Sequence, residues 1–396
     1  MDLWCSVFPI PCLQPGTRVK LKTPYSNRIK DHKWTLIPEI KKIMNPVEET
    51  GEVRDAHRFD TNALSDYLRY ALGDAFKEKL TIAQFGYGQS NPTFIIKTGG
   101  REYVLRKKPP GKLLPSAHAV EREYRVIKAL SHTDVPVPEP IILCEDESVI
   151  GTAFYVMDKL EGRIFRDNTA SVIDDPEERS AIFDAMNDTL ARIHKVDYRA
   201  IGLESFGKPG NYMSRQVTRW TKQYRASQTD DMESMENLIS WLADNIPEDD
   251  FTTIAHGDFR LDNLVIHPSE PKVLAVIDWE LSTLGHPLAD LAYNCMWYHL
   301  AHGNVKLAGF VGLNIEERGI PTEETYVNNY CRRTGRDGIS DWEFYLAFSM
   351  FRLASIAQGV YKRGLDGNAS SAVALGYRDA LKILSDAAWK IVRESK

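Results

Sequence analysis

Three short runs of β-branched and aromatic residues stand close together in the first third of the chain, and they restrict its fold more than any other feature. The runs are Thr81–Phe85, Thr93–Lys97 and Glu102–Lys107, and turn residues separate them, at Gly86-Tyr87-Gly88 and Gly99-Gly100. Connections this short join antiparallel strands. The segment is therefore predicted to form antiparallel hairpins.

Helical patterns flank these hairpins. The pattern predicts that order begins near Phe59, with Asp60 or Asn62 capping a helix whose apolar residues recur at helical spacing. After the hairpins we expect a helix over 117–130 and two more strands near Pro140–Cys144 and Ala153–Met157.

From Pro176 onward the pattern is mainly helical, with one short β segment flanking residues 254–278. The fold class is therefore predicted to be α+β, with a small antiparallel-sheet N-lobe and a larger, mainly helical C-lobe. We expect an N-terminal extension over 1–58, partly disordered, then the N-lobe over 59–158 and the C-lobe over 159–396. A cleft between two such lobes is a common place for a ligand.

Bulk composition excludes some classes of function. The formal net charge of −6 gives no reason to expect nucleic-acid binding, and no run of about 18 apolar residues suggests a transmembrane segment. Five scattered cysteines without a Cys-x-x-Cys pair favour a reducing compartment, so we expect a cytoplasmic protein. The basic, acid-poor residues 1–30 leave a mitochondrial transit peptide as the alternative, although four prolines interrupt any helix there.

The most informative motif is His256-Gly257-Asp258-Phe259-Arg260-Leu261-Asp262-Asn263, which an apolar strand connects to Asp278. The spacing His-x-Asp-x4-Asn followed by a later Asp matches the catalytic loop and metal-binding Asp of kinases. Asp258 is of the type that accepts a proton from an attacking hydroxyl. Asn263 and Asp278 supply the hard oxygen ligands that Mg²⁺ prefers. The alternative, that these residues only cap loops, does not explain their order.

A glycine-containing turn lies upstream, in the order that a kinase requires. Glycines let a backbone approach phosphates closely, and successive N–H groups can cradle them. The turn lacks the third glycine of the protein-kinase loop, and an ordinary hairpin turn is the alternative. The candidate phosphate-binding residues are Gly86, Gly88, Ser90 and Asn91.

The next strand and helix carry a cation and a glutamate. Kinases pair such a cation with a helix glutamate to hold the α- and β-phosphates. Arg106 is the favoured cation, Lys107 is the alternative, and Glu123 is the candidate glutamate. Alternation along the strand puts Val104 on the same face as Arg106, where it would line an adenine pocket.

The strand at 154–158 ends where a hinge between lobes is expected. Backbone groups of Asp158 and Leu160 are candidates for binding the adenine edge, although an ordinary exit from a strand would have a similar sequence.

In this order of motifs the chain resembles the aminoglycoside phosphotransferase/choline kinase-like family, over about residues 59–392. The resemblance rests on Tyr103–Arg106, Val120–Glu123, His256–Asp258 with Asn263, and Ile277-Asp278. It implies a two-lobed, protein-kinase-like fold and an enzyme that uses ATP and Mg²⁺. It also implies that Asp258 is the base, that Asn263 and Asp278 bind the metal and that Glu123 anchors the strand cation.

The match is closer to one branch, the kinase-like region of acyl-CoA dehydrogenase family members 10 and 11. This resemblance rests on four segments, His256–Asn263, Asp278–Pro287, Phe351–Ala354 and Gln358–Arg363. It implies a hydroxyacyl-CoA or related hydroxy acid as the phosphate acceptor and a separate acyl-CoA dehydrogenase as a partner.

Cations in the C-terminal segment suit an acidic acceptor, and we expect Arg352 and Arg363 to bind it. The alternatives are a kinase of the aminoglycoside or choline type and a catalytically inactive nucleotide-binding scaffold. A protein substrate is disfavoured because no Ala-Pro-Glu segment follows Asp278 and the chain enters an apolar helix, Leu288–Leu300.

Overall fold

The N-terminal part of the molecule is a single antiparallel sheet. The computed structural model describes residues 50–86, 91–110, 118–303, 307–367 and 372–395. Strands pair in the order β1-β2-β3-β4-β6-β5. Their bounds are β1 (Thr50–Gly51), β2 (Thr81–Phe85), β3 (Thr93–Thr98), β4 (Arg101–Lys107), β5 (Pro140–Cys144) and β6 (Phe154–Asp158). The predicted hairpins are confirmed, and β1 adds an edge strand from within the segment expected to be an extension.

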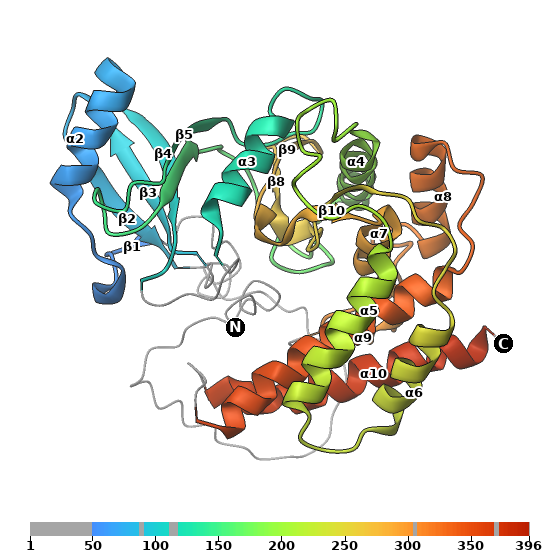
Figure 1. Cartoon of the computed structure of the whole chain (residues 1–396). Coiled ribbons are helices and arrows are strands. Elements are labelled where there is room, and N and C mark those ends of the chain that lie inside the picture. The colour runs from blue at the N-terminus through green and yellow to red at the C-terminus, as the bar shows by residue number, and fades with distance from the viewer. Residues whose placement is uncertain (1–49, 87–90, 111–117, 304–306, 368–371, 396) are drawn as a thin grey trace, which may run out of the picture.

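Different helices cover the two faces of this sheet. Helix α2 (Thr61–Leu72) is capped by Asp60, whose Oδ1 accepts hydrogen bonds from the N–H groups of Asn62 and Ala63. It packs with Tyr103 and Leu105 of β4 in one apolar cluster. Helix α3 (Val120–Leu130) packs with Val104 of β4 on the other face (Figure 1). Both faces of β4 are therefore buried.

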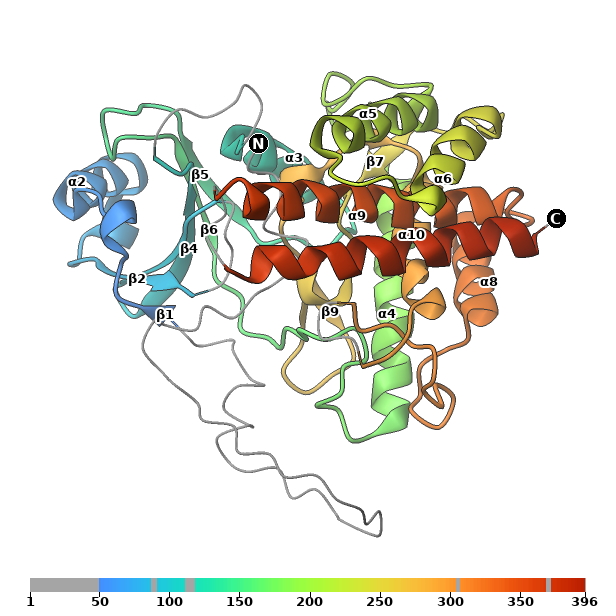
Figure 2. The ribbon, with the colours of Figure 1, turned by 90° about the horizontal axis from the view of Figure 1, so that it is seen from below.

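The C-terminal part is mainly helical, and Figure 2 shows α9 and α10 lying side by side along one side of it. Residues 344–359 of α9 are almost all buried, because other helices surround this segment. The helices are α4 (Pro176–Lys195), α5 (Tyr212–Ser227), α6 (Glu233–Asp244), α7 (Pro287–Cys295), α8 (Glu323–Thr334), α9 (Trp342–Leu365) and α10 (Tyr377–Glu394).

Two small antiparallel ribbons lie between the sheet and the helices. One pairs β7 (Thr253–Ala255) with β10 (Thr283–Gly285), and the other pairs β8 (Leu264–Ile266) with β9 (Val273–Val276). The loop from β7 to β8 carries Asp258, and the loop from β9 to β10 carries Asp278. The ribbons thus hold both motifs at the boundary of the two lobes (Figure 1).

The fold class predicted from the sequence is confirmed, an antiparallel N-terminal sheet followed by a mainly helical region. The apolar helix expected at 288–300 is α7 followed by a 3-10 helix, Met296–His299. No helix within the described ranges is long and apolar enough to span a membrane. The N-terminal extension before residue 50, including the segment considered as a transit peptide, lies outside the described residues.

Candidate active site

The loop after β7 is held by a buried carboxylate of α7. The N–H groups of His256 and Gly257 donate to the two carboxylate oxygens of Asp290, at 2.6 and 2.9 Å. The His256 ring contacts the segment that carries Asp278, because its Nε2 lies 3.0 Å from the carbonyl oxygen of Ile277. Burial opposes the charge of Asp290, but His194, His256 and the Gly257 amide hold the pKa of this carboxyl below its ordinary value.

Gly257 cannot be replaced without strain. Its φ is +84°, in the left-handed region that side chains rarely adopt, and an added Cβ would lie 2.8 Å from the carbonyl oxygen of Leu281. The glycine therefore allows the loop to turn beneath the Asp278 segment and to present Asp258.

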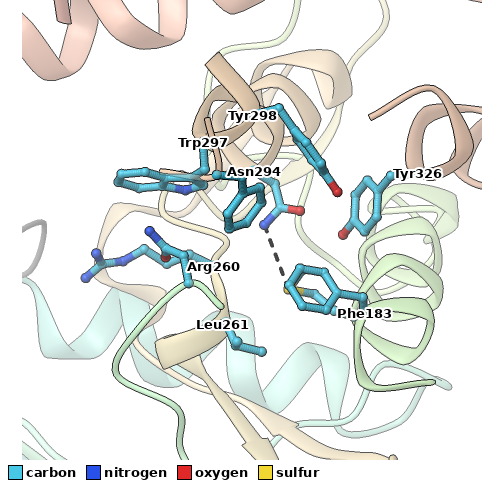
Figure 3. Close-up of a pocket in the computed structure, with 10 residues that line it drawn as sticks. Phe183, Arg260, Leu261, Asn294, Trp297, Tyr298 and Tyr326 are labelled. Atoms are coloured by element: carbon cyan, nitrogen blue, oxygen red, sulfur yellow. Dashed lines mark hydrogen bonds between the residues drawn. The ribbon is translucent and has the colours of Figure 1, made fainter. Parts of the chain in front are cut away.

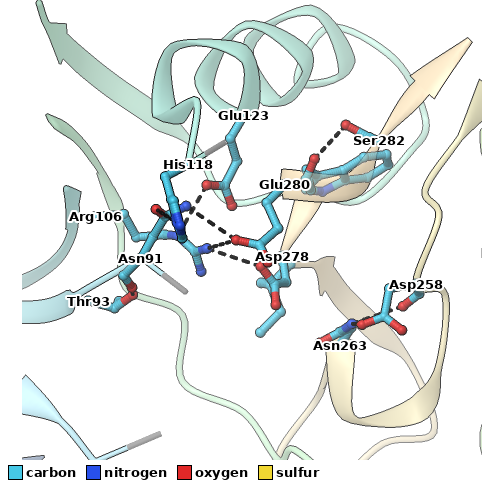
Figure 4. Close-up of polar contacts among 12 residues, drawn as sticks. Asn91, Thr93, Arg106, His118, Glu123, Asp258, Asn263, Asp278, Glu280 and Ser282 are labelled. Atoms are coloured by element: carbon cyan, nitrogen blue, oxygen red, sulfur yellow. Dashed lines mark hydrogen bonds and ion pairs between the residues drawn. The ribbon is translucent and has the colours of Figure 1, made fainter. Parts of the chain in front are cut away.

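The Asp258 carboxylate is buried and held from several sides, and Figure 4 shows Asn263 next to it. Its Oδ1 accepts a hydrogen bond from the Tyr293 hydroxyl at 2.7 Å, and its Oδ2 accepts one from Asn263 Nδ2 at 3.1 Å. The Nε of Arg260 lies 3.4 Å from Oδ1. The carboxylate thus has a defined orientation before any substrate arrives, as a general base requires.

Asn263 and Asp278 are brought together by the backbone. Nδ2 of Asn263 donates both to the carbonyl oxygen and to Oδ2 of Asp258, which leaves its Oδ1 as the side-chain oxygen available to a ligand. The Ile277 N–H donates to the Asn263 carbonyl at 2.9 Å, so the residue before Asp278 is tied to Asn263. Asp278 itself has φ +65° and ψ +55°, a strained conformation typical of functional loops.

Arg106 bridges the sheet, α3 and the Asp278 loop. Its Nε lies 3.2 Å from Glu123, and its terminal NH2 lies 3.0 Å from Asp278 and 3.7 Å from Glu280. These four side chains form one group in Figure 4. The alternative cation, Lys107, is on the opposite face of β4.

Arg106 and the carboxyl group of Glu123 shift each other's pKa values. Although burial opposes it, the carboxylates of Glu123 and Asp278 raise the pKa of Arg106 well above its ordinary value. Burial raises the pKa of Glu123 to about 7, against the opposing charge of Arg106. Three carboxyl groups, those of Glu123, Asp278 and Glu280, thus share one guanidinium.

The arrangement fits a magnesium ion that is completed by phosphate oxygens. Within the described part of the chain no three His, Cys, Asp or Glu side chains form a group that could hold a metal ion. Mg²⁺ is usually bound by one or two carboxylates together with waters and substrate phosphates. Asp278 and the free oxygen of Asn263 are the residues suited to that role.

The glycine-containing turn is described only in part. Gly86 accepts a hydrogen bond from Arg54 at its carbonyl, while Gly88 and Ser90 lie outside the described residues. Asn91 is buried. Its Nδ2 donates to Glu280 at 3.3 Å, and its Oδ1 lies 3.1 Å from His118 Nδ1. The side chain of Asn91 therefore connects the turn to the Asp278 loop.

The residues predicted around adenine lie along β4 and β6. Val104 is buried, pairs with Met157 of β6 and is on the same face of β4 as Arg106. The N–H of Asp158 donates to the carbonyl of Glu139, and Leu160 follows it half-buried.

The two arginines predicted to bind the acceptor are both on α9. Arg352 donates to the Gly257 carbonyl at 2.7 Å and therefore lies directly beside the loop that carries Asp258. Arg363 lies eleven residues further along the same helix and is half-buried. The structure thus brings Arg352 into contact with the loop.

A cavity behind the loop is too small for a substrate. Its volume is about 10 Å³, room for roughly one water molecule. Figure 3 shows aromatic and polar side chains around it, with Arg260 and Leu261 on the loop side and Phe183 and Tyr326 from helices. It is part of the packing behind the loop.

Sequence reasoning missed four residues that hold the site: Arg260, Glu280, Asp290 and Tyr293. Asp290 carries a usable signal, since it is the only charged residue in the apolar segment 288–298. The Tyr293 side chain has no such signal, because its role depends on a hydrogen bond to a residue 35 positions away.

Comparisons with curated proteins identify long relatives. The chain is 47% identical over 364 residues to mouse acyl-CoA dehydrogenase family member 10, covering 91% of this chain and 34% of that protein. It is 48% identical over 328 residues to human acyl-CoA dehydrogenase family member 11, covering 82% of this chain and 42% of that protein. The chain thus spans about a third to two fifths of these relatives, and the resemblance to part of them is confirmed.

Solved structures share the fold. A Ralstonia eutropha protein provisionally assigned as an aminoglycoside phosphotransferase is 50% identical, with a TM-score of 0.78 over 85% of this chain and 99% of that chain. A thermostable variant of aminoglycoside phosphotransferase APH(4)-Ia, solved with ADP and hygromycin B, is 16% identical. Its TM-score is 0.54 over 83% of this chain and 98% of that chain, and this likeness concerns the fold alone.

The family model described as phosphotransferase enzyme family (APH) matches residues 81–321, which include β2 to β10 and the residues around Asp258 and Asp278. With the Ralstonia relative matched over almost its whole length, the two comparisons agree. The chain belongs to the aminoglycoside phosphotransferase-like family of phosphotransferase enzymes.

Proposed function

We propose that this protein transfers the γ-phosphate of ATP to a hydroxyl group of a small molecule. In this proposal Asp258 accepts the proton of the attacking hydroxyl, while Arg106, held by Glu123, binds the α- and β-phosphates. The turn containing Gly86, Gly88, Ser90 and Asn91 covers the phosphates. Val104 and the backbone of Asp158 and Leu160 bind adenine.

One observation carries the proposal: a buried, oriented Asp258 lies next to Asn263, and Asn263 is tied through the backbone to the Asp278 loop. Phosphoryl transfer needs little covalent chemistry from a protein, so positioning and electrostatics account for most of the catalysis. These residues would position a hydroxyl on one side and the phosphates on the other. An inactive scaffold would not require an oriented base, and this disfavours that alternative.

Magnesium is the cofactor that the residues suit. When bound, it neutralises charge on the β- and γ-phosphate oxygens. Asp278 and Asn263 would hold it. Arg106 contacts Asp278 directly at 3.0 Å, so this cation restricts the orientation of the carboxylate. The APH(4)-Ia structures contain ADP or AMP-PNP, and this supports a nucleotide as the second substrate.

The acceptor is proposed to be a hydroxyacyl-CoA or a related hydroxy acid, bound through Arg352 and Arg363. The names of the long relatives refer to acyl-CoA, and the cations of α9 suit an acidic compound. A separate acyl-CoA dehydrogenase is proposed as a partner for the same reason. An aminoglycoside is the second candidate, because the Ralstonia relative is assigned to that class.

The first test replaces Asp258 by Asn, which keeps the shape and removes the base. General base catalysis contributes about 10²–10⁴-fold, so kcat is expected to fall by that order while the ATP Kd stays within about twofold. Turnover is measured by mass spectrometry of the phosphorylated product, and ATP binding by calorimetry. Wild-type turnover in the Asp258→Asn protein would refute the assignment of the base.

The second part of the test is an acceptor screen with the wild-type protein. It includes hydroxyacyl-CoA esters, free hydroxy acids, choline, sugars and kanamycin. We expect phosphate transfer to a hydroxyacyl compound only. Transfer to kanamycin or choline alone would leave the kinase assignment and remove the proposed acceptor.

A further inference from the structure

Two arginines from different helices converge on one indole ring beside the catalytic loop. The guanidinium carbon of Arg219, on α5, lies 5.6 Å from the centre of the Trp220 ring, and that of Arg352, on α9, also lies 5.6 Å from it. Helices α5 and α9 pack side by side in both views (Figures 1 and 2). Arg219 was not among the residues predicted from the sequence.

The cluster is close to the base. Arg352 donates to the Gly257 carbonyl at 2.7 Å, one residue before Asp258. It also lies 5.4 Å from the ring centre of Tyr293, whose hydroxyl donates to Asp258 at 2.7 Å. These contacts and the length of the tyrosine ring put the guanidinium within about 11 Å of the Asp258 carboxylate.

The two guanidinium groups of the cluster carry like charge. Among the described residues neither Arg219 nor Arg352 forms an ion pair with a carboxylate. Burial lowers the pKa of Arg219, and the like charge of Arg352 lowers it further. The neighbouring Arg215 differs, because it donates to the Lys208 and Gly210 carbonyls and is thereby occupied.

The platform on which the two arginines lie is fixed. Gln358 of α9 is buried and donates to the Ser227 carbonyl at 2.6 Å and to the Thr229 hydroxyl at 3.2 Å, both at the end of α5. These two bonds hold the end of α5 against α9 about 1.7 turns beyond Arg352. Two like charges are therefore kept together, at a cost that an anionic ligand would offset.

We propose that Arg219 and Arg352, both lying against Trp220, bind an acidic oxygen group of the acceptor and position its hydroxyl at Asp258. The inference rests on the proposed function and adds Arg219 to it as a specificity residue. Guanidinium groups bind carboxylate and phosphate oxygens through paired N–H donors. A neutral or cationic acceptor would leave both charges unmatched.

The acidic group has two possible sources, which differ in the distance between that group and the hydroxyl. The carboxylate of a free 4-hydroxy acid lies about 5 Å from the hydroxyl, whereas the nearest phosphate of an extended 4-hydroxyacyl-CoA lies about 20 Å from it. Both present the same anionic oxygens. The distance of at most about 11 Å between Arg352 and the Asp258 carboxylate suits the shorter compound, since an extended CoA thioester would place its phosphate beyond the cluster. Matched pairs of probes separate the two sources. The first pair is a 4-hydroxy acid and its amide, and the second is the CoA thioester and the N-acetylcysteamine thioester, which lacks phosphates.

The experiment measures the acceptor KM and kcat of the wild-type, Arg219→Ala and Arg219→Lys proteins with the four probes. Binding of each probe in the presence of AMP-PNP is measured by calorimetry. In the wild type we expect the charged member of one pair to bind about tenfold more tightly than its neutral counterpart, since ionised hydrogen bonds are about twice as strong as neutral ones. The Arg219→Ala change should abolish this preference by raising the KM and Kd of the charged probe about tenfold, while the ATP KM stays within about twofold of the wild type. Arg219→Lys should restore part of it.

Arg225→Ala is the matched control. Arg225 is on α5, but it pairs with Glu236, and its loss should leave the preference unchanged. An unchanged preference in Arg219→Ala, or no preference in the wild type, would overturn the proposal. Calorimetry distinguishes this result from failure of the proposed function. If the wild type binds a charged probe through Arg219 but transfers phosphate to none of the four, the subsite stands and the acceptor assignment fails.

Discussion

Replacing Asp290 by Asn tests whether the catalytic loop is held by charge from α7. Asp290 is 2% exposed, and each of its oxygens accepts one backbone N–H, from His256 at 2.6 Å and from Gly257 at 2.9 Å. Asparagine has nearly the same shape but only one acceptor oxygen. Its NH2 group would face one of the two N–H donors and leave that donor unpaired.

The expected magnitude follows from these contacts. Hydrogen bonds to a charged group contribute about 1.5–3 kcal/mol each, and an unpaired buried donor costs about 1–3 kcal/mol. The hydrogen bond to the oxygen of the new Asn is kept, but its acceptor is no longer charged. We therefore expect the free energy of unfolding to fall by about 2–4 kcal/mol. We also expect a lower kcat, because Gly257 directly precedes Asp258.

Urea denaturation gives the change in unfolding free energy, and steady-state kinetics at a temperature where the variant is folded gives kcat. Asp386→Asn is the control, since Asp386 is on α10 and pairs with exposed Lys382, where a change is expected to stay within about 0.5 kcal/mol. Asp290→Asn with wild-type stability and wild-type kcat would show that the two backbone contacts do not position the loop.

Two further changes test the metal site and the pH dependence of stability. Asp278→Ala should abolish the magnesium dependence of ATP binding in calorimetry, because Asn263 alone is a neutral ligand, and an unchanged Mg-ATP Kd would exclude Asp278 as the metal ligand. Burial lowers the pKa of His286 to about 4 from 6.5, so between these values the unfolded state binds more protons and stability is lost as the pH falls from 6.5 toward 4. The loss should reach about 2–3 kcal/mol. In the His286→Asn protein the new side chain can still cap α7 by accepting from the Leu288 N–H. This change should remove the part of the pH dependence of the unfolding free energy that is due to His286, as measured by urea titrations at pH 7 and pH 5. An equal loss of stability between these pH values in both proteins would contradict the prediction.

Much of the fold could be predicted because its signals are local. Alternating apolar residues and glycine turns specify β2, β3 and β4 within a few residues of their observed bounds. The cap at Asp60 and the spacing from His256 to Asn263 depend on neighbours within one or two turns of chain. Short-range geometry does not change when the rest of the protein folds around it, so these predictions were robust.

The alternation of side chains along β4 did not determine which cation, Arg106 or Lys107, faces the cleft between the lobes. Both faces of this strand are buried, so hydrophobic pattern alone did not distinguish Arg106 from Lys107. The packing of α2 and α3 on opposite faces decides it: Lys107 lies near the Phe59 ring, with 5.6 Å between the ammonium and the ring centre, while Arg106 contacts Glu123.

The sequence by itself determined the order of the elements and the residue types around Asp258 and Asp278. The patterns that indicate them each occupy a contiguous stretch of chain. Only the tertiary structure decided what holds those residues in place. Asp290 is 34 positions from His256, Tyr293 is 35 from Asp258 and Arg352 is 95 from Gly257. No periodicity connects residues so far apart. They meet because helices α7 and α9 pack against the same loop, and that packing depends on the apolar surfaces of the whole C-terminal region.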